Sequence, residues 1–63
     1  MCLGTAYYIQ GQSQEKILQD VAFIDLHGDQ IRLVTLLGQE KLVDGKLLEV
    51  DLEQGSILLQ ARS

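Results

Sequence analysis

The sequence contains no proline, no tryptophan and a single cysteine, which stands at position 2 of 63 residues. One cysteine excludes an intrachain disulfide. A domain of this size buries only about 60% of the surface that its unfolded chain exposes, and small domains often gain stability from a metal or from a second chain. We therefore expect one domain, residues 1–63, that depends on a metal or on oligomerisation.

Positive charge is also scarce. The sequence contains five Lys and Arg residues and nine Asp and Glu residues, which gives a net charge of −4. This charge repels phosphate backbones and anionic membranes. No charged leader followed by an apolar segment opens the chain, and the apolar stretch LVTLL at residues 33–37 is too short to span a bilayer. We interpret the protein as cytoplasmic, where a free thiol stays reduced.

The motifs of common enzyme sites are missing: GxGxxG, GxxxxGK[ST], HExxH and CxxC do not occur. Acidic residues occupy every second position at Glu49, Asp51 and Glu53. This spacing is typical of a solvated strand face and gives little support for acid–base catalysis. His27, the only histidine, is expected at the entry to a hairpin, without partners for a metal. We interpret the protein as one that is not an enzyme.

Glycine spacing predicts an all-β fold. Gly28, Gly38, Gly45 and Gly55 lie ten, seven and ten residues apart between apolar or alternating segments, and glycine tolerates the positive φ of tight hairpin turns. We expect a small, strongly bent antiparallel sheet that closes towards a barrel, with a type I′ turn at Asp44-Gly45. The six expected strands are residues 2–10, 21–27, 30–37, 40–43, 46–52 and 56–60. The polar segment 11–16 is expected to be a loop.

Alternation along these strands predicts one apolar core and a second apolar surface. The core residues expected from it are Ala22, Ile24, Leu26, Ile31, Leu33, Leu48, Val50, Leu52, Ile57 and Leu59. The opposite faces still carry Val21, Phe23, Val34, Leu36, Leu47 and Leu58. A second apolar surface on so short a chain is usually buried against another copy, so we expect a homodimer, with scattered hydrophobic residues on a monomer as the alternative.

Cys2 is the candidate metal ligand. Its thiolate lies within chelate reach of the Met1 terminal amine and of its own amide nitrogen, so one chain end offers nitrogen and sulfur donors. Such donors in a plane suit Ni(II) or Cu(II), whereas Zn(II) would need more protein ligands. A twofold axis between two chain ends would complete a square of four donors. The alternative is that Cys2 is an ordinary small apolar residue at a frayed end.

Met1-Cys2, a strand, a polar loop and the run DVAFIDLHGDQIRLVTLLGQEKLVDGKLLEVDLEQGSILL at residues 20–59 together resemble the CooT family of small nickel-binding proteins. The most specific parts are Met1-Cys2 and LLGQEKLVDGKLLEVDLEQG at residues 36–55. The resemblance implies a homodimer that binds Ni(II) through Cys2, beside the Met1 amine. It also implies an accessory role in nickel delivery to carbon monoxide dehydrogenase, with the nickel enzyme or its maturation factors as partners.

Related sequences are also described as predicted RNA-binding proteins, because the expected barrel is SH3-like or Sm-like. Fold analogy is a weak basis for function. An RNA binder that ignores sequence needs a basic patch, whereas the basic residues here are scattered along the chain, at Lys16, Arg32, Lys41, Lys46 and Arg62. A small RNA-binding barrel remains the alternative, beside a purely structural interaction module.

Overall fold

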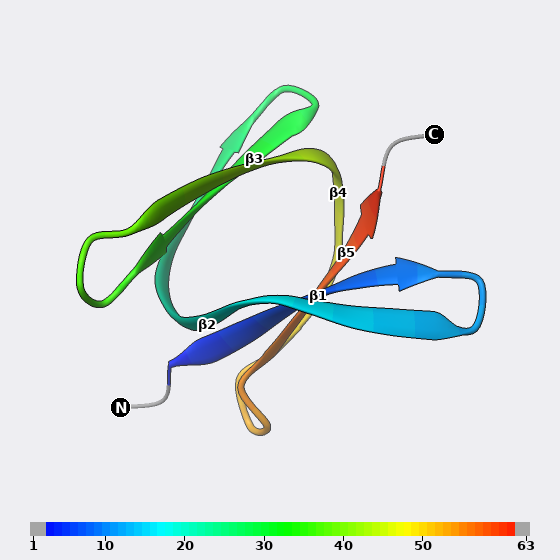
Figure 1. Ribbon diagram of the computed structural model, residues 1–63, viewed down its shortest axis with the longest axis horizontal. Helices are drawn as coiled ribbons and strands as arrows, with labels where there is room; N and C mark the ends of the chain where they lie inside the picture. Colours follow the sequence, from blue (N-terminus) through cyan, green and yellow to red (C-terminus); the bar gives the residue numbers. More distant parts are fainter. Residues whose placement is uncertain (1–2, 62–63) are drawn as a thin grey trace.

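The structure is a computed structural model, and it describes residues 3–61. These residues form five strands (Figure 1): β1 (Gly4–Gln10), β2 (Ser13–His27), β3 (Gln30–Thr35), β4 (Glu40–Asp51) and β5 (Ser56–Ala61). Neighbours along the chain pair antiparallel, and β1 pairs in parallel with β5, which closes the sheet into a barrel. The expected all-β barrel is confirmed. Residues 3–61 contain no helix that has the length and hydropathy to cross a membrane.

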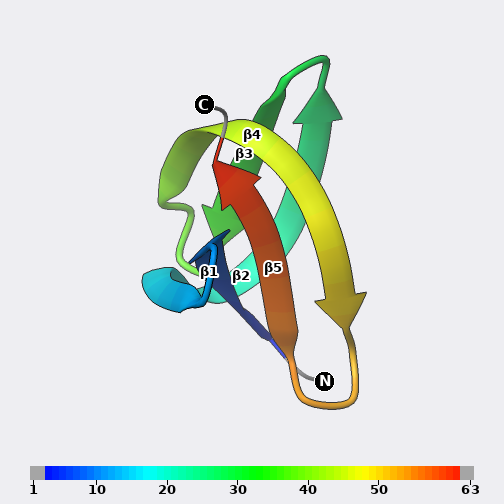
Figure 2. The same cartoon turned by 90° about the vertical axis from the view of Figure 1, so that its right-hand side faces the viewer.

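The two longest strands bend so that each belongs to both halves of the barrel. β2 pairs with β1 as far as Val21, and from Val21 onward it pairs with β3. β4 pairs with β3 up to Asp44 and with β5 from Gly45 onward, and Figure 2 shows its continuous curve. The five-stranded barrel therefore closes although its two longest strands, β2 and β4, contain only 15 and 12 residues.

The structure has five strands because Gly45 is part of β4 and does not form the expected turn after Asp44. Gly45 is buried and lies opposite Ala61 of β5, and a Cβ atom at this position would collide with the carbonyl oxygen of Gln60. Glycine is therefore required for the close approach of two backbones. The two short strands expected at 40–43 and 46–52 are one bent strand.

Gly45→Ala is accordingly expected to destabilise the fold, by about 2 kcal/mol or more, because the new methyl group must displace the backbone of β5. Urea denaturation followed by circular dichroism measures the change. Lys46→Ala is the matched control, since Lys46 is the exposed neighbour in the same strand and its side chain can be lost at little cost. Equal midpoints for the two variants would contradict this account of Gly45.

The expected loop at 11–16 is also wrong beyond its first two residues. Gly11, with φ of 59°, and Gln12 form a tight turn, after which β2 begins at Ser13. The Ser13 hydroxyl donates a hydrogen bond to the Gln10 carbonyl oxygen at 2.9 Å and closes this turn. Residues 13–16 are exposed and belong to β2, so polarity was a poor guide to their conformation.

Two β-bulges decide which side chains enter the core. The register shifts between Val21 and Phe23 in β2 and between Leu47 and Glu49 in β4. An extra residue in one strand moves the following side chains to the other face. Val21 is therefore buried and Leu47 packs against the core, whereas the expected core residues Ala22 and Leu48 are exposed.

The core lies inside the barrel and consists of Ala6, Val21, Ile31, Leu33, Val43, Ile57 and Leu59. The predictions for Ile31, Leu33, Ile57 and Leu59 are confirmed, and Ile24 packs against this cluster. The predictions for Leu26, Val50 and Leu52 are wrong: these side chains lie at strand ends or in a turn, beyond the closed part of the barrel, and stay exposed.

Tyr8 packs against the core, whereas its neighbour Tyr7 points to the opposite face of β1. Burial raises the pKa of Tyr8, and the negative charges of Asp44 and Glu15 raise it further. Tyr8 therefore remains a neutral phenol across the physiological pH range. The two adjacent tyrosines therefore do not share one stacking surface.

Candidate metal centre

The start of β1 is fixed against the turn that joins β4 to β5. The Thr5 amide donates to the Gly55 carbonyl oxygen at 2.8 Å. Gly55 has a φ of 71°, and a Cβ atom there would come within 2.9 Å of the Leu3 carbonyl oxygen. Glycine at position 55 therefore permits both the turn and the close approach of Leu3, the first described residue.

Asp51 organises this β4–β5 turn. Its carbonyl oxygen accepts a hydrogen bond from the Gly55 amide at 2.7 Å. Its carboxylate oxygen Oδ1 accepts from the amides of Glu53 and Gln54 at 3.0 and 3.2 Å. Asp51 thus serves as a turn cap, a role that the period-two pattern of acids did not indicate.

The turn that joins β3 to β4, residues 36–39, flanks Leu3 on another side. Thr35 is buried and holds this turn through three bonds: its amide donates to Gln39 O at 2.8 Å, its Oγ1 accepts from the Gln39 amide at 3.0 Å, and its carbonyl accepts from the Gly38 amide at 3.0 Å. The turn presents Leu36 and Leu37 outward, 62% and 92% exposed. The hydrogen bonds of the β3–β4 turn therefore keep the side chains of Leu36 and Leu37 exposed to solvent.

Leu3, Leu36 and Leu37 line one hollow of about 260 Å³, together with Gln19, Asp20, Thr35 and Gln39. Figure 1 shows the start of β1 between the β3–β4 and β4–β5 turns. Asp20 has a φ of 59°, a conformation that Asp tolerates better than most residues, and its carbonyl oxygen accepts from the Leu36 amide at 2.9 Å. An exposed carboxylate and two exposed leucines thus surround the residue that follows Cys2.

The two predicted metal-site residues, Cys2 and Met1, lie outside the described residues. His27, the other possible donor, is exposed at the end of β2, on the β2–β3 hairpin that Figure 1 shows away from the start of β1. Within residues 3–61 the structure contains no group of three or more His, Cys, Asp or Glu side chains that could hold a metal ion. The described residues therefore define the surroundings of the chain start and leave the predicted ligands untested.

The comparison with protein families gives a match over residues 1–60 to the model described as CO dehydrogenase accessory protein CooT. The chain belongs to the CooT family. As an accessory protein in the maturation of CO dehydrogenase, this CooT protein is not itself an enzyme, as the sequence predicted.

In fold, the CooT chain is similar to the crystal structure of a protein assigned as a CooT from Carboxydothermus hydrogenoformans, with a TM-score of 0.90 and 24% sequence identity. The similarity covers 98% of this chain and 100% of the other. At this identity the likeness shows the fold. The comparison with curated proteins gave no match.

Proposed function

We propose that this CooT protein binds Ni(II) through the Cys2 thiolate, with the Met1 amine as a neighbouring donor, and delivers it in the cytoplasm to carbon monoxide dehydrogenase or its maturation factors. Membership of the CooT family supports the accessory role for CO dehydrogenase. The observation that carries the proposal is the fixed position of Leu3 against Gly55, because a ligand one residue away from an anchored strand is restricted in where it can lie.

The chemistry of the donors favours nickel. A metal deprotonates a coordinating thiol, and amine, amide and thiolate donors suit the square-planar geometry of Ni(II). One chain end supplies too few protein donors for a tetrahedral zinc site. Two chain ends that each supply the thiolate and one nitrogen donor fill the four positions of a square plane, so the proposed site is shared by a homodimer.

The exposed leucines support a dimer at this end of the barrel. Leu36 and Leu37 project beside Leu3, and their burial against a second copy would remove apolar surface from water. A twofold axis near this surface would bring the two chain starts together, as a shared nickel ion requires. The dimer and the metal site would then use the same end of each barrel.

Titration of the purified protein with NiCl₂ tests this proposal. We expect a thiolate-to-nickel charge-transfer band in the near ultraviolet that saturates at one nickel per two chains. Protein alkylated with iodoacetamide is the matched sample, because Cys2 is the only thiol. Undiminished nickel binding after alkylation would contradict the Cys2 site, and saturation at one nickel per chain would contradict the shared site.

A further inference from the structure

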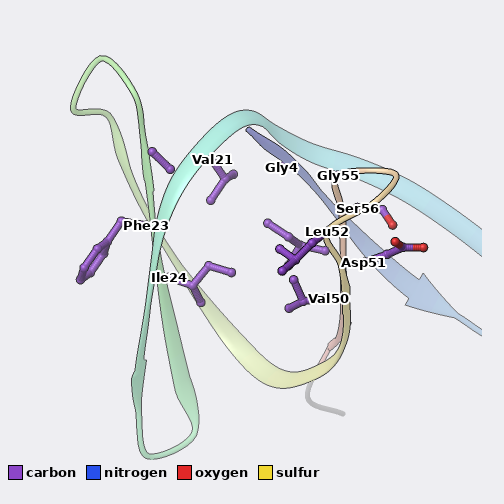
Figure 3. A pocket seen from close by; sticks show the side chains of 11 residues that line it. Gly4, Val21, Phe23, Ile24, Val50, Asp51, Leu52, Gly55 and Ser56 are labelled. Carbon is purple, nitrogen blue, oxygen red and sulfur yellow. The ribbon is translucent and has the colours of Figure 1, made fainter. Parts of the chain in front are cut away.

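The barrel has an apolar opening between β2 and β4, which we call the barrel mouth (Figure 3). Val21 and Ile24 border it on β2, Val50 and Leu52 border it at the end of β4, and Ile57 of β5 also lines it. The cavity has a volume of about 240 Å³. In Figure 3 the side chains of Ile24 and Val50 point towards each other across it. This space can accept one or two aliphatic side chains.

The strands on either side of the barrel mouth each have one paired edge. Beyond Val21, β2 pairs only with β3, and beyond Asp44, β4 pairs only with β5, among the described residues. No Cα atoms of these two strands lie within 8 Å of each other. Adjacent paired strands are about 4.8 Å apart, so the two backbones do not close the opening.

The free edge of β2 can accept another strand. His27 and Gln30 flank a two-residue turn, and in such a hairpin every second residue pair exchanges both backbone hydrogen bonds. Ile24 and Leu26 fall between these pairs, so their N–H and C=O groups point away from β3. Unpaired groups at strand spacing are a template for an added strand.

The charge of the segments that border the barrel mouth indicates which kind of strand would bind there. The segments that border the barrel mouth, residues 17–27 and 47–57, contain five acidic residues and no Lys or Arg. These acids are Asp20, Asp25, Glu49, Asp51 and Glu53. Among the described residues, the only ion pair that they form joins Asp25 to Arg32, at 3.5 Å. Asp51 alone of these five lines the cavity, and Asp20 lies in the hollow beside Leu3, so the negative charge belongs to the two bordering segments as a whole.

We propose that the barrel mouth binds an extended segment of a partner protein that carries an aliphatic side chain flanked by Lys or Arg, and that this segment pairs with the free edge of β2. The aliphatic side chain enters the cavity and the basic residues meet the acidic segments that border it. The interaction needs neither Cys2 nor a metal. It is separate from the proposed dimer surface at Leu36 and Leu37.

A second copy of this chain is a poor occupant of the barrel mouth. In a twofold dimer the same surface faces itself, so the two acidic segments of one copy would meet the same acidic segments of the other. Like charges placed opposite one another oppose association. A basic partner removes this repulsion and also gains the attraction between opposite charges.

The test uses the capped peptide Lys-Thr-Val-Leu-Val-Thr-Lys as probe and the full-length protein. Amide chemical shifts in nuclear magnetic resonance spectra locate the bound peptide, and fluorescence anisotropy of a labelled peptide measures its affinity. We expect shift changes concentrated in residues 22–27 and 47–57. A peptide with Glu in place of both Lys residues should bind at least tenfold more weakly, as should one with N-methylated backbone amides.

Leu52→Lys is the test variant, because Leu52 is 80% exposed in a turn and lines the cavity. It should weaken peptide binding at least tenfold. Leu42→Lys is the matched control: Leu42 is 64% exposed and lies opposite Arg32 in the β3–β4 pair, so affinity should change less than twofold. The proposal is overturned if the wild-type protein does not bind the peptide, or if shift changes lie elsewhere. It is also overturned if Leu52→Lys converts a dimer to a monomer, because a second copy would then occupy the mouth.

Discussion

Cys2→Ser is expected to abolish tight Ni(II) binding while the fold and the proposed dimer persist. A serine hydroxyl is a poor anionic ligand at neutral pH, whereas nickel readily deprotonates a thiol. The affinity should fall by more than about 100-fold, because even the loss of an outer partner of a metal ligand costs 10–100-fold. Isothermal titration calorimetry gives the affinity, and loss of the charge-transfer band identifies the missing thiolate.

His27→Ala is the matched control for this experiment. His27 is the only histidine and is exposed on the β2–β3 hairpin, so its removal should leave nickel affinity unchanged. If the serine variant kept the wild-type affinity, the donors would lie elsewhere. If it unfolded or dissociated, Cys2 would be a packing residue and not a ligand.

Leu37→Glu is expected to separate the proposed dimer into folded chains of about 7.0 kDa. Leu37 is 92% exposed, so the substitution should cost the single chain little, but it places a charge in the proposed interface and near Asp20. Burying one leucine contributes roughly 1.5–3 kcal/mol, and a twofold interface loses two of them. Dimerisation should weaken by roughly 100-fold or more, which sedimentation velocity at micromolar concentration can measure.

Leu42→Glu serves as the control for Leu37→Glu, because it adds the same charge at an exposed leucine away from the chain start. It should leave the sedimentation coefficient unchanged. Nickel titration of the two variants then links assembly to metal binding: the shared site predicts weak binding by Leu37→Glu alone. A Leu37→Glu protein that remained dimeric would place the interface on another surface.

The sequence predicted those parts of the fold that depend on uninterrupted alternation. In β3 and β5 the pattern continues without a bulge, and Ile31, Leu33, Ile57 and Leu59 are buried as expected. Glycines at 28, 38 and 55 have positive φ in turns, which is the feature that their spacing indicated. Local pattern was sufficient because each of these strands is short and keeps one register.

The parts that were missed depend on contacts between distant segments. The bulges near Ala22 and Leu48 exist because β2 and β4 change partners along their length, and one sequence window contains no record of such a change. Asp44-Gly45 fits a hairpin turn as well as a bent strand. Only the position of the Gln60 carbonyl beside Gly45 distinguishes the two.

Only the ligands of the candidate metal site could be predicted from the sequence. Cys2 and Met1 follow from the order of the chain, and their role stays a prediction. The surroundings of the chain start were not visible in the sequence, because residues 30–37 looked like one continuous strand. In the structure Leu36 and Leu37 leave that strand, since Thr35 closes a turn onto Gln39. The left-handed backbone at Asp20 likewise lies where the β1–β2 register shifts.

The parallel pairing of β1 with β5 has a consequence for the synthesis of the protein. β1 reaches one of its two partners only after β5 exists, so the barrel cannot close until β5 has been made. Contacts between residues this far apart in sequence require closure of a long loop and slow the folding of small β proteins. The Gly55 carbonyl that anchors Thr5 is itself made long after Thr5. In the nascent chain β1 therefore lacks one partner until β5 is made, and Leu3 gains its fixed surroundings only when the barrel has closed.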